Sequence, residues 1–291
     1  MTTSSAGRVL LACLALAGCA GGRAAQRGGS TPEERIVFVD GPAGRLRVSD
    51  GGAGGTPVVL VHGLGGNIDL WRAQLDHLRR SRRAVAIELR GHGRSAPPAS
   101  GDWSMEALAD DVEAAAQALG LDRFVLVGHS MGGCVIEAYA ARHRDRLAGL
   151  VFADGVASFA ALEPKVIAAA IAEDASSIGD DPKRQRAAFE EMLGPNATRA
   201  TRARVLEGLS RLPPEAFVAL RRAMFHFRPS ADLAAGSLPI ATIEGEGNQF
   251  PVVASRIYPS AAHRTIAGAS HWLMLDAPEA FDRALDELLP P

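Results

Sequence analysis

The sequence has few aromatic residues, few cysteines and almost no excess of charge of either sign. Aromatic side chains make up 5% of the 291 residues, and there are three cysteines. The 31 basic and 33 acidic residues give a formal net charge of −2, and no block rich in lysine and arginine stands out. We therefore expect no broad electrostatic attraction to nucleic acid. The apolar content of 47% suits a globular protein with one sizeable domain.

Motifs for several other chemistries are also missing. No phosphate-binding loop and no dinucleotide-binding glycine motif follows a predicted strand. No HExxH helix and no paired CxxC motifs provide ligands for a metal ion. The sequence therefore predicts a protein that works without a cofactor and without a metal.

A short apolar segment lies close to the N-terminus. Arg8 precedes the run VLLACLALA, and Cys19 follows shortly after it. The run is too short to cross a bilayer, which requires about 20 apolar residues, and is typical of a secretory signal peptide. Its end, LAGC, resembles the lipobox of bacterial lipoproteins, which implies lipid modification of Cys19. The alternative is an ordinary cleaved signal peptide with an incidental cysteine.

This segment sets the expected location and the first domain boundaries. We interpret residues 1–18 as the signal peptide and residues 19–35 as the lipidated cysteine with a flexible tether. The mature protein is then exported and anchored to the membrane, facing the periplasm or the cell exterior. Cys134 remains as a lone thiol in the folded domain, so no internal disulfide is expected.

From residue 36 onward, apolar runs of strand length alternate with amphipathic helical patterns. Such alternation predicts an α/β fold with a mostly parallel, doubly wound sheet. Residues 155–238 interrupt it with a largely helical stretch, so the core divides into residues 36–154 and 239–291. Strands are expected at 36–39, 45–48, 57–61, 84–89, 123–128, 147–154, 239–243 and 263–266, and core helices at 68–80, 104–119, 131–143 and 277–289.

The sequence Gly128-His129-Ser130-Met131-Gly132 lies between a predicted strand and a predicted helix. This context is typical of a nucleophile elbow, a sharp turn that exposes the serine hydroxyl above the sheet. Glycines suit its two ends, because a side chain there would collide with neighbouring backbone. The pattern makes Ser130 the candidate nucleophile.

A serine nucleophile requires a nearby base, and the sequence contains eight histidines. His271 follows the last predicted strand and lies downstream of Ser130, in the chain order typical of this architecture. His62 and His92 lie in glycine-flanked turns that favour structural hydrogen bonds. His129 adjoins the nucleophile, but its position in the elbow directs its side chain away. His271 is therefore the candidate general base.

Together these motifs resemble the α/β-hydrolase fold superfamily. The resemblance rests on VHGLGG, RGHGRS, GHSMGG, GEGN and GASHW, each in the expected context, and extends from about residue 36 to the C-terminus. It implies an oxyanion hole formed by the backbone N–H groups of Leu64 and Met131. It also implies that residues 155–238 form a helical cap over the pocket.

The expected acid departs from the family pattern. The loop after the late strand commonly reads G-x-x-D in the family, and here it ends in Asn248. Asparagine accepts a hydrogen bond from imidazole but carries no charge to stabilise the imidazolium. The best substitute is Asp154, after the preceding strand, although an aspartate there also occurs in relatives that keep the later acid. Glu246 is the reserve candidate.

These features predict a serine hydrolase that cleaves an ester-like bond of a small to mid-sized, partly apolar molecule through an acyl-enzyme intermediate. A thioesterase, lactonase, amidase, carbon–carbon hydrolase or perhydrolase would use the same residues. The alternative from another class is a noncatalytic or weakly catalytic ligand-binding member of the fold, suggested by Asn248. The expected partners are the small-molecule substrate and the membrane, and the oligomeric state stays open.

Overall fold

The structure is a computed structural model that describes residues 34–195, 197–229, 233, 236–246, 248 and 252–290. The predicted signal peptide, Cys19 and most of the predicted tether lie outside the described residues. No helix within the described ranges is long and apolar enough to cross a membrane.

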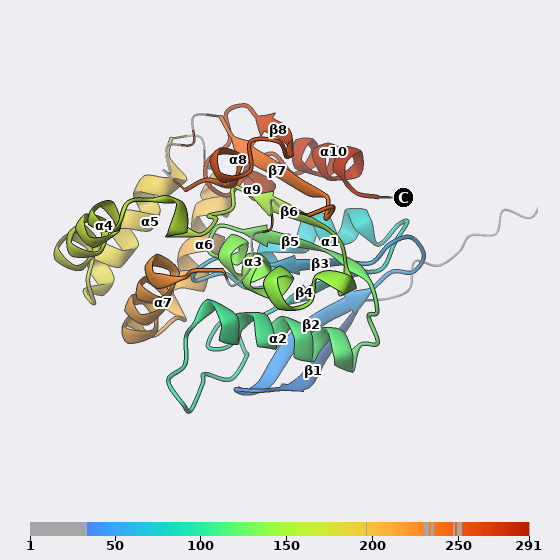
Figure 1. The fold of residues 1–291 in the computed structure, drawn as a ribbon, viewed down its shortest axis with the longest axis horizontal. Helices are drawn as coiled ribbons and strands as arrows, with labels where there is room; N and C mark the ends of the chain where they lie inside the picture. Colours follow the sequence, from blue (N-terminus) through green and yellow to red (C-terminus); the bar gives the residue numbers. More distant parts are fainter. Residues whose placement is uncertain are drawn as a thin grey trace, which may run out of the picture. The chain divides into compact units, whose positions relative to one another are not determined.

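The apolar runs of the sequence form one eight-stranded sheet in the order β1-β2-β4-β3-β5-β6-β7-β8 (Figure 1). The first two strands pair antiparallel, β2 pairs antiparallel with β4, and all the other pairs are parallel. The prediction of a mostly parallel α/β sheet is therefore confirmed. The strands are β1 (Arg35–Gly41), β2 (Gly44–Gly51), β3 (Val58–Val61), β4 (Ala84–Ile87), β5 (Phe124–His129), β6 (Leu147–Ala153), β7 (Ile240–Gly245) and β8 (Ala262–Ile266).

Helices cover the sheet in two groups. In one, α2 packs on α3, and α3 packs on β5; in the other, α1, α9 and α10 contact one another. The side chain of Ser104 caps α2 by accepting a hydrogen bond of 3.2 Å from the N–H of Ala107. The central strands β3, β4 and β5 are buried along their whole length, which explains their continuous apolar sequence. The bounds are α1 (Arg72–Leu78), α2 (Met105–Ala118), α3 (Gly132–Arg142), α8 (Ala254–Ile257), α9 (Leu273–Asp276) and α10 (Pro278–Leu288).

Among the described residues, four α-helices lie between β6 and β7, and Figure 1 shows them grouped to the left of the sheet. Proline begins three of them, where its fixed φ fits the first helical turn. The Phe189 ring contacts Trp272, which follows β8, at 5.5 Å between ring centroids. This group is thus packed onto the core. Its members are α4 (Pro164–Ser177), α5 (Pro182–Leu193), α6 (Arg199–Ser210) and α7 (Pro214–His226).

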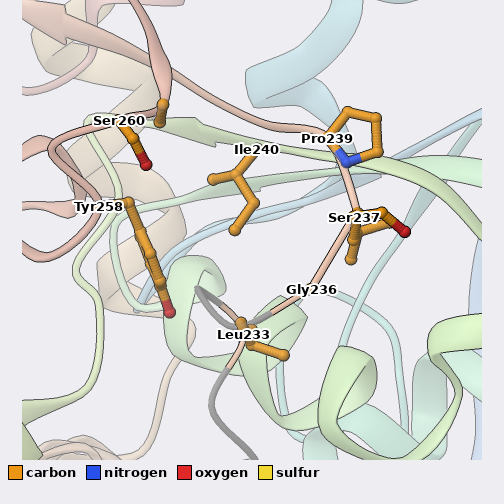
Figure 2. A pocket seen from close by; sticks show the side chains of 9 residues that line it. Leu233, Gly236, Ser237, Pro239, Ile240, Tyr258 and Ser260 are labelled. Atoms are coloured by element: carbon orange, nitrogen blue, oxygen red, sulfur yellow. The ribbon is translucent and has the colours of Figure 1, made fainter.

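A cavity of about 290 Å³ lies where β7 begins (Figure 2). Pro239, Ile240 and Tyr258 are among the residues that line it. The beginning of β7 is the opposite edge of the parallel sheet from the end of β5, where Ser130 follows. The cavity is therefore separate from the predicted site.

Tyr258 lines this cavity, and its hydroxyl donates a hydrogen bond to the carboxyl group of Glu137 on α3. Glu137 is fully buried. Burial raises the pKa of Glu137 to about 8, outweighing the hydrogen bonds from Tyr258 and the Ser158 backbone that lower it. The carboxyl group is therefore mainly protonated in the folded protein at neutral pH.

We expect Glu137→Gln to stabilise the protein at neutral and higher pH. Between about pH 4.5 and 8 the unfolded chain releases the Glu137 proton while the folded chain keeps it, so the wild-type free energy of unfolding falls as the pH rises. The difference reaches the order of 5 kcal/mol at about pH 8. Glutamine does not ionise, so the variant lacks this fall and matches the wild type near pH 4.

Urea unfolding across this pH range measures the effect, with Glu207→Gln on an exposed face of α6 as the matched control. A variant that is no more stable than the wild type above pH 7 contradicts the prediction.

Candidate active site

The turn between β5 and α3 holds Ser130 in a left-handed backbone conformation, with φ at +52°. The flanking glycines make this turn possible. A Cβ atom on Gly128 would lie 2.4 Å from the carbonyl oxygen of Gly132, and one on Gly132 would lie 2.7 Å from that of Val61. The backbone geometry is that of a strained strand-to-helix turn. It presents Ser130 at the carboxyl edge of the sheet.

The loop after β3 contacts this turn directly. A Cβ atom on Gly63 would lie 2.7 Å from the Cβ of Ser130, so only glycine fits between them. The loop closes through a 3.0 Å hydrogen bond from the N–H of Gly66 to the carbonyl of Gly63, with Leu64 inside it. Met131 follows Ser130 and precedes the first residue of α3. The structure thus brings the loop of Leu64, Met131 and the helix N-terminus together around Ser130.

His62 holds this loop in place. Its Nδ1 donates to the carbonyl of Gly63 at 2.8 Å, and its Nε2 accepts from the N–H of Leu89 at 3.1 Å. The ring is completely buried, which lowers the pKa of His62 well below its ordinary value. His62 is therefore neutral and has a fixed tautomer, in agreement with its predicted structural role.

His271 and Asp154 form a direct contact. Nδ1 of His271 lies 2.7 Å from Oδ2 of Asp154, and both side chains are buried. Asp154 follows β6 directly and has a φ of +46°, which turns its side chain toward the end of β7. There its Oδ1 accepts a hydrogen bond of 2.9 Å from the N–H of Gly245.

The electrostatics of this contact favour an ionised carboxylate. Burial raises the pKa of Asp154, but the hydrogen bond and charge of His271 lower it, as do the N–H of Gly245 and the side chain of Asn248. The net effect is a pKa below the ordinary value. The site therefore holds a negative charge against Nδ1 of His271.

The two other acid-position residues lie differently. The side chain of Asn248, at the usual acid position of the family, acts on Asp154 and lowers the pKa of its carboxyl group. Glu246 is exposed, and its backbone N–H donates to the carbonyl of Ile266 at 3.0 Å. The structure thus brings Asp154 to His271 and leaves Glu246 at the surface.

Sequence reasoning missed the residues that hold the loop of His271. Oδ2 of Asp276 accepts from the N–H and the hydroxyl of Ser270, the former at 2.9 Å. Nε2 of His129 contacts the carbonyl oxygen of His271 at 2.8 Å. Asp276 lies six positions after Ser270, at the end of a one-turn helix, and this spacing is the only sequence signal.

Helix α6 contacts the Leu64 loop through two glycines. A Cβ atom on Gly208 would lie 2.4 Å from the carbonyl oxygen of Gly65, whose own φ is +67°. A Cβ atom on Gly65 would in turn lie 3.2 Å from the Cα of Leu209. The backbones of α6 and the loop are therefore in direct contact. Helix α6 thus packs against the loop that lies beside Ser130.

Comparison with known proteins identifies the family. The sequence pattern of the alpha/beta hydrolase fold matches residues 56–210, and the chain belongs to this family. Over 95 residues it is 43% identical to epoxide hydrolase 3 of Xenopus tropicalis, covering 32% of this chain and 26% of that protein. Over 102 residues it is 32% identical to a human (lyso)-N-acylphosphatidylethanolamine lipase, covering 34% of this chain and 30% of that protein. These matches span less than a third of either relative.

The fold extends much further than these sequence matches. An esterase from Thermogutta terrifontis superimposes with a TM-score of 0.68 at 29% identity, covering 87% of this chain and 97% of that one. The likeness therefore includes the inserted helices as well as the sheet.

We expect Gly208→Ala to destabilise the protein by about 1–3 kcal/mol, because the added methyl group collides with the backbone of Gly65. The sign of this change in the free energy of unfolding is informative, because replacing glycine by alanine inside a helix ordinarily stabilises a protein by about 0.5–1 kcal/mol. Urea unfolding measures the change. Ser210→Ala, on the exposed end of the same helix, serves as the control and stays near the wild type. An increase in stability for Gly208→Ala would show that the contact has room to relax.

Proposed function

We propose that this protein is a serine hydrolase that cleaves an ester-like bond of a small to mid-sized, partly apolar substrate. The observation that carries the proposal is the 2.7 Å contact between His271 and Asp154, at the sheet edge where the elbow presents Ser130. The fold likeness to an esterase, which covers 87% of this chain, supports it. A nucleophile, a base and an orienting acid are the three groups that acyl transfer requires.

In the proposed mechanism, Nε2 of His271 takes the hydroxyl proton of Ser130 while Oγ attacks the substrate carbonyl carbon. The N–H groups of Leu64 and Met131 bind the oxyanion that forms, each contributing about 3–4 kcal/mol in the transition state. His271 then gives the proton to the leaving alcohol, and an acyl-enzyme ester remains on Ser130. Water activated by His271 hydrolyses this ester.

The ionised Asp154 has two roles in this cycle. It keeps the imidazole in the tautomer whose Nε2 is free of a proton, and it stabilises the imidazolium that forms when His271 takes the proton. Asn248 and the N–H of Gly245 hold the carboxylate in its ionised form. An amide at position 248 is therefore compatible with catalysis, because it supports the acid.

The identity of the nucleophile favours acyl chemistry. An alkyl-enzyme ester of the kind formed in epoxide opening requires a carboxylate nucleophile, and the elbow of this chain carries a serine. Aromatic contacts in the segment between β6 and β7, such as Phe159 with Phe225 at 5.0 Å between ring centroids, provide an apolar environment. Both features support a carboxylic ester with an apolar acyl group.

The noncatalytic alternative depends on a site without an acid. The contact of Asp154 with His271 argues against that alternative, because it places a carboxylate at Nδ1 of His271. We therefore place enzymatic turnover ahead of simple ligand binding.

We expect full-length protein to hydrolyse p-nitrophenyl esters of graded acyl length, and Ser130→Ala to abolish this activity. Asp154→Asn is expected to lower kcat by about 10⁴-fold, the loss typical of an amide at this position. Glu246→Gln is the control and keeps wild-type kcat, because its side chain is exposed.

Two results would reject parts of this mechanism. Activity that survives in Ser130→Ala rejects the nucleophile, and equal activity in Asp154→Asn and wild type rejects the acid. If the ester panel is not hydrolysed, labelling of Ser130 by a fluorophosphonate decides whether the nucleophile is activated.

We further propose export and anchoring through a lipid on Cys19, which the run VLLACLALA and the LAGC motif support. In a bacterial host, Cys19→Ala is expected to move the protein from the membrane fraction to the soluble fraction. Cys134→Ala, which changes a buried thiol, is the control and leaves the protein in the membrane fraction. Equal membrane association of both variants argues against lipidation.

A further inference from the structure

The side chain of His129 lies between the loops that carry two of the proposed catalytic groups. It is 1% exposed, at the last position of β5. Its ring centroid lies 4.8 Å from that of His271 and 6.3 Å from that of Trp71. A Cβ atom on Gly63 would lie 3.1 Å from its Nδ1. The imidazole of His129 therefore lies next to both the loop that carries His271 and the loop that carries Leu64.

The direction of its hydrogen bond is determined by chemistry. Nε2 of His129 lies 2.8 Å from the carbonyl oxygen of His271, and a carbonyl oxygen only accepts. Nε2 therefore carries the proton and donates. The bond joins residues 142 positions apart and ties the backbone of His271 to the end of the central strand.

We propose that His129 is a positioning residue for the hydrolase reaction, holding the main chain of His271 so that its ring stays between Asp154 and Ser130. This inference rests on the proposed function. Such control matters because a displacement of about 1 Å in a catalytic group can cost 10²-fold in rate.

The electrostatic environment keeps this hydrogen bond in one form. Burial lowers the pKa of His129 to about 3, helped by the nearby His271, while its hydrogen bond to His271 and the charge of Asp154 oppose the change. The nearby ring of His62 also interacts electrostatically with His129. The ring is therefore neutral throughout the working pH range, and its Nε2 proton remains available for the carbonyl of His271.

The other hydrogen bonds of the loop that carries His271 show why the bond from His129 is able to position the main chain of His271. The hydrogen bonds of Asp276 and Ser270 join residues within this loop, between positions 270 and 276. The ring of His271 is held to Asp154, which fixes its tip and not its main chain. The bond from His129 is the one among these that links the His271 backbone to the elbow strand.

Three variants of the full-length protein test this proposal. His129→Leu removes the donor; His129→Gln keeps an amide N–H that reaches the position of Nε2; His143→Gln, at a partly exposed histidine after α3, is the control. The measurements are kcat and KM on the best p-nitrophenyl ester, and the downfield proton NMR signal of the Nδ1–H that His271 shares with Asp154.

We expect His129→Leu to lower kcat by about 10- to 100-fold with KM nearly unchanged, and to shift or broaden the NMR signal. His129→Gln should recover most of kcat and the signal, and His143→Gln should match the wild type. If His129 only stabilises the fold, His129→Leu would instead lower the amount of folded protein. In that case kcat would not fall separately from KM, and glutamine would not restore it.

Wild-type kcat and an unchanged NMR signal in His129→Leu would overturn the proposal. If His129→Leu does not fold, His129→Asn replaces it, because its shorter amide does not reach the carbonyl, and equal values for Asn and Gln overturn the proposal. If the wild type hydrolyses no ester and takes no fluorophosphonate label, the proposed function fails, and the NMR comparison alone still decides whether His129 positions His271.

Discussion

The buried pair of Asp154 and His271 is the interaction on which the site depends. A charged carboxylate inside a protein is costly unless it is paired and hydrogen-bonded. Here the carboxylate receives His271 on one oxygen and the N–H of Gly245 on the other, so it joins the ends of β6 and β7 to the loop after β8. Ser130 follows the neighbouring strand β5, which pairs parallel with β6. The parallel sheet therefore carries all three groups to the same edge.

Close approach of backbones is the second constraint. Gly128 and Gly132 let the elbow turn against β3, and Gly63 lets the neighbouring loop touch Ser130. Gly208 does the same for helix α6 against Gly65. At each position a Cβ atom would overlap a neighbouring residue, so glycine is required by space and not only by backbone flexibility. Helix α6 thereby packs against the same loop that contacts Ser130.

Burial disfavours the charged form of each buried ionisable group, and the partners of a group decide whether it stays charged. Glu137, His62 and His129 have no opposite charge strong enough to offset burial, so burial keeps them neutral. Asp154 has such partners and stays ionised. The ionised Asp154 therefore lies next to His271, while the other buried groups named above are neutral. Such a difference in charge state between neighbouring titratable groups is typical of sites that transfer protons. The three neighbouring histidines also differ in their contacts. His62 and His129 form hydrogen bonds with backbone groups, whereas His271 contacts the carboxylate of Asp154.

Local pattern in the sequence determined the strands, the main helices, the elbow around Ser130 and the place of His271 after the last strand. Each depends on residues close together in the chain: apolar periodicity, glycine spacing and a capping serine. Which of Asp154, Glu246 and Asn248 contacts the ring of His271 depends on tertiary structure. The contact of Asp154 with His271 spans 117 positions and depends on the pairing of β6 with β7 and on the positive φ of Asp154. The bond from His129 to His271 and the contact of Gly208 with Gly65 have the same origin. They arise only when distant segments pack, because a sequence pattern records local periodicity and not the register between strands.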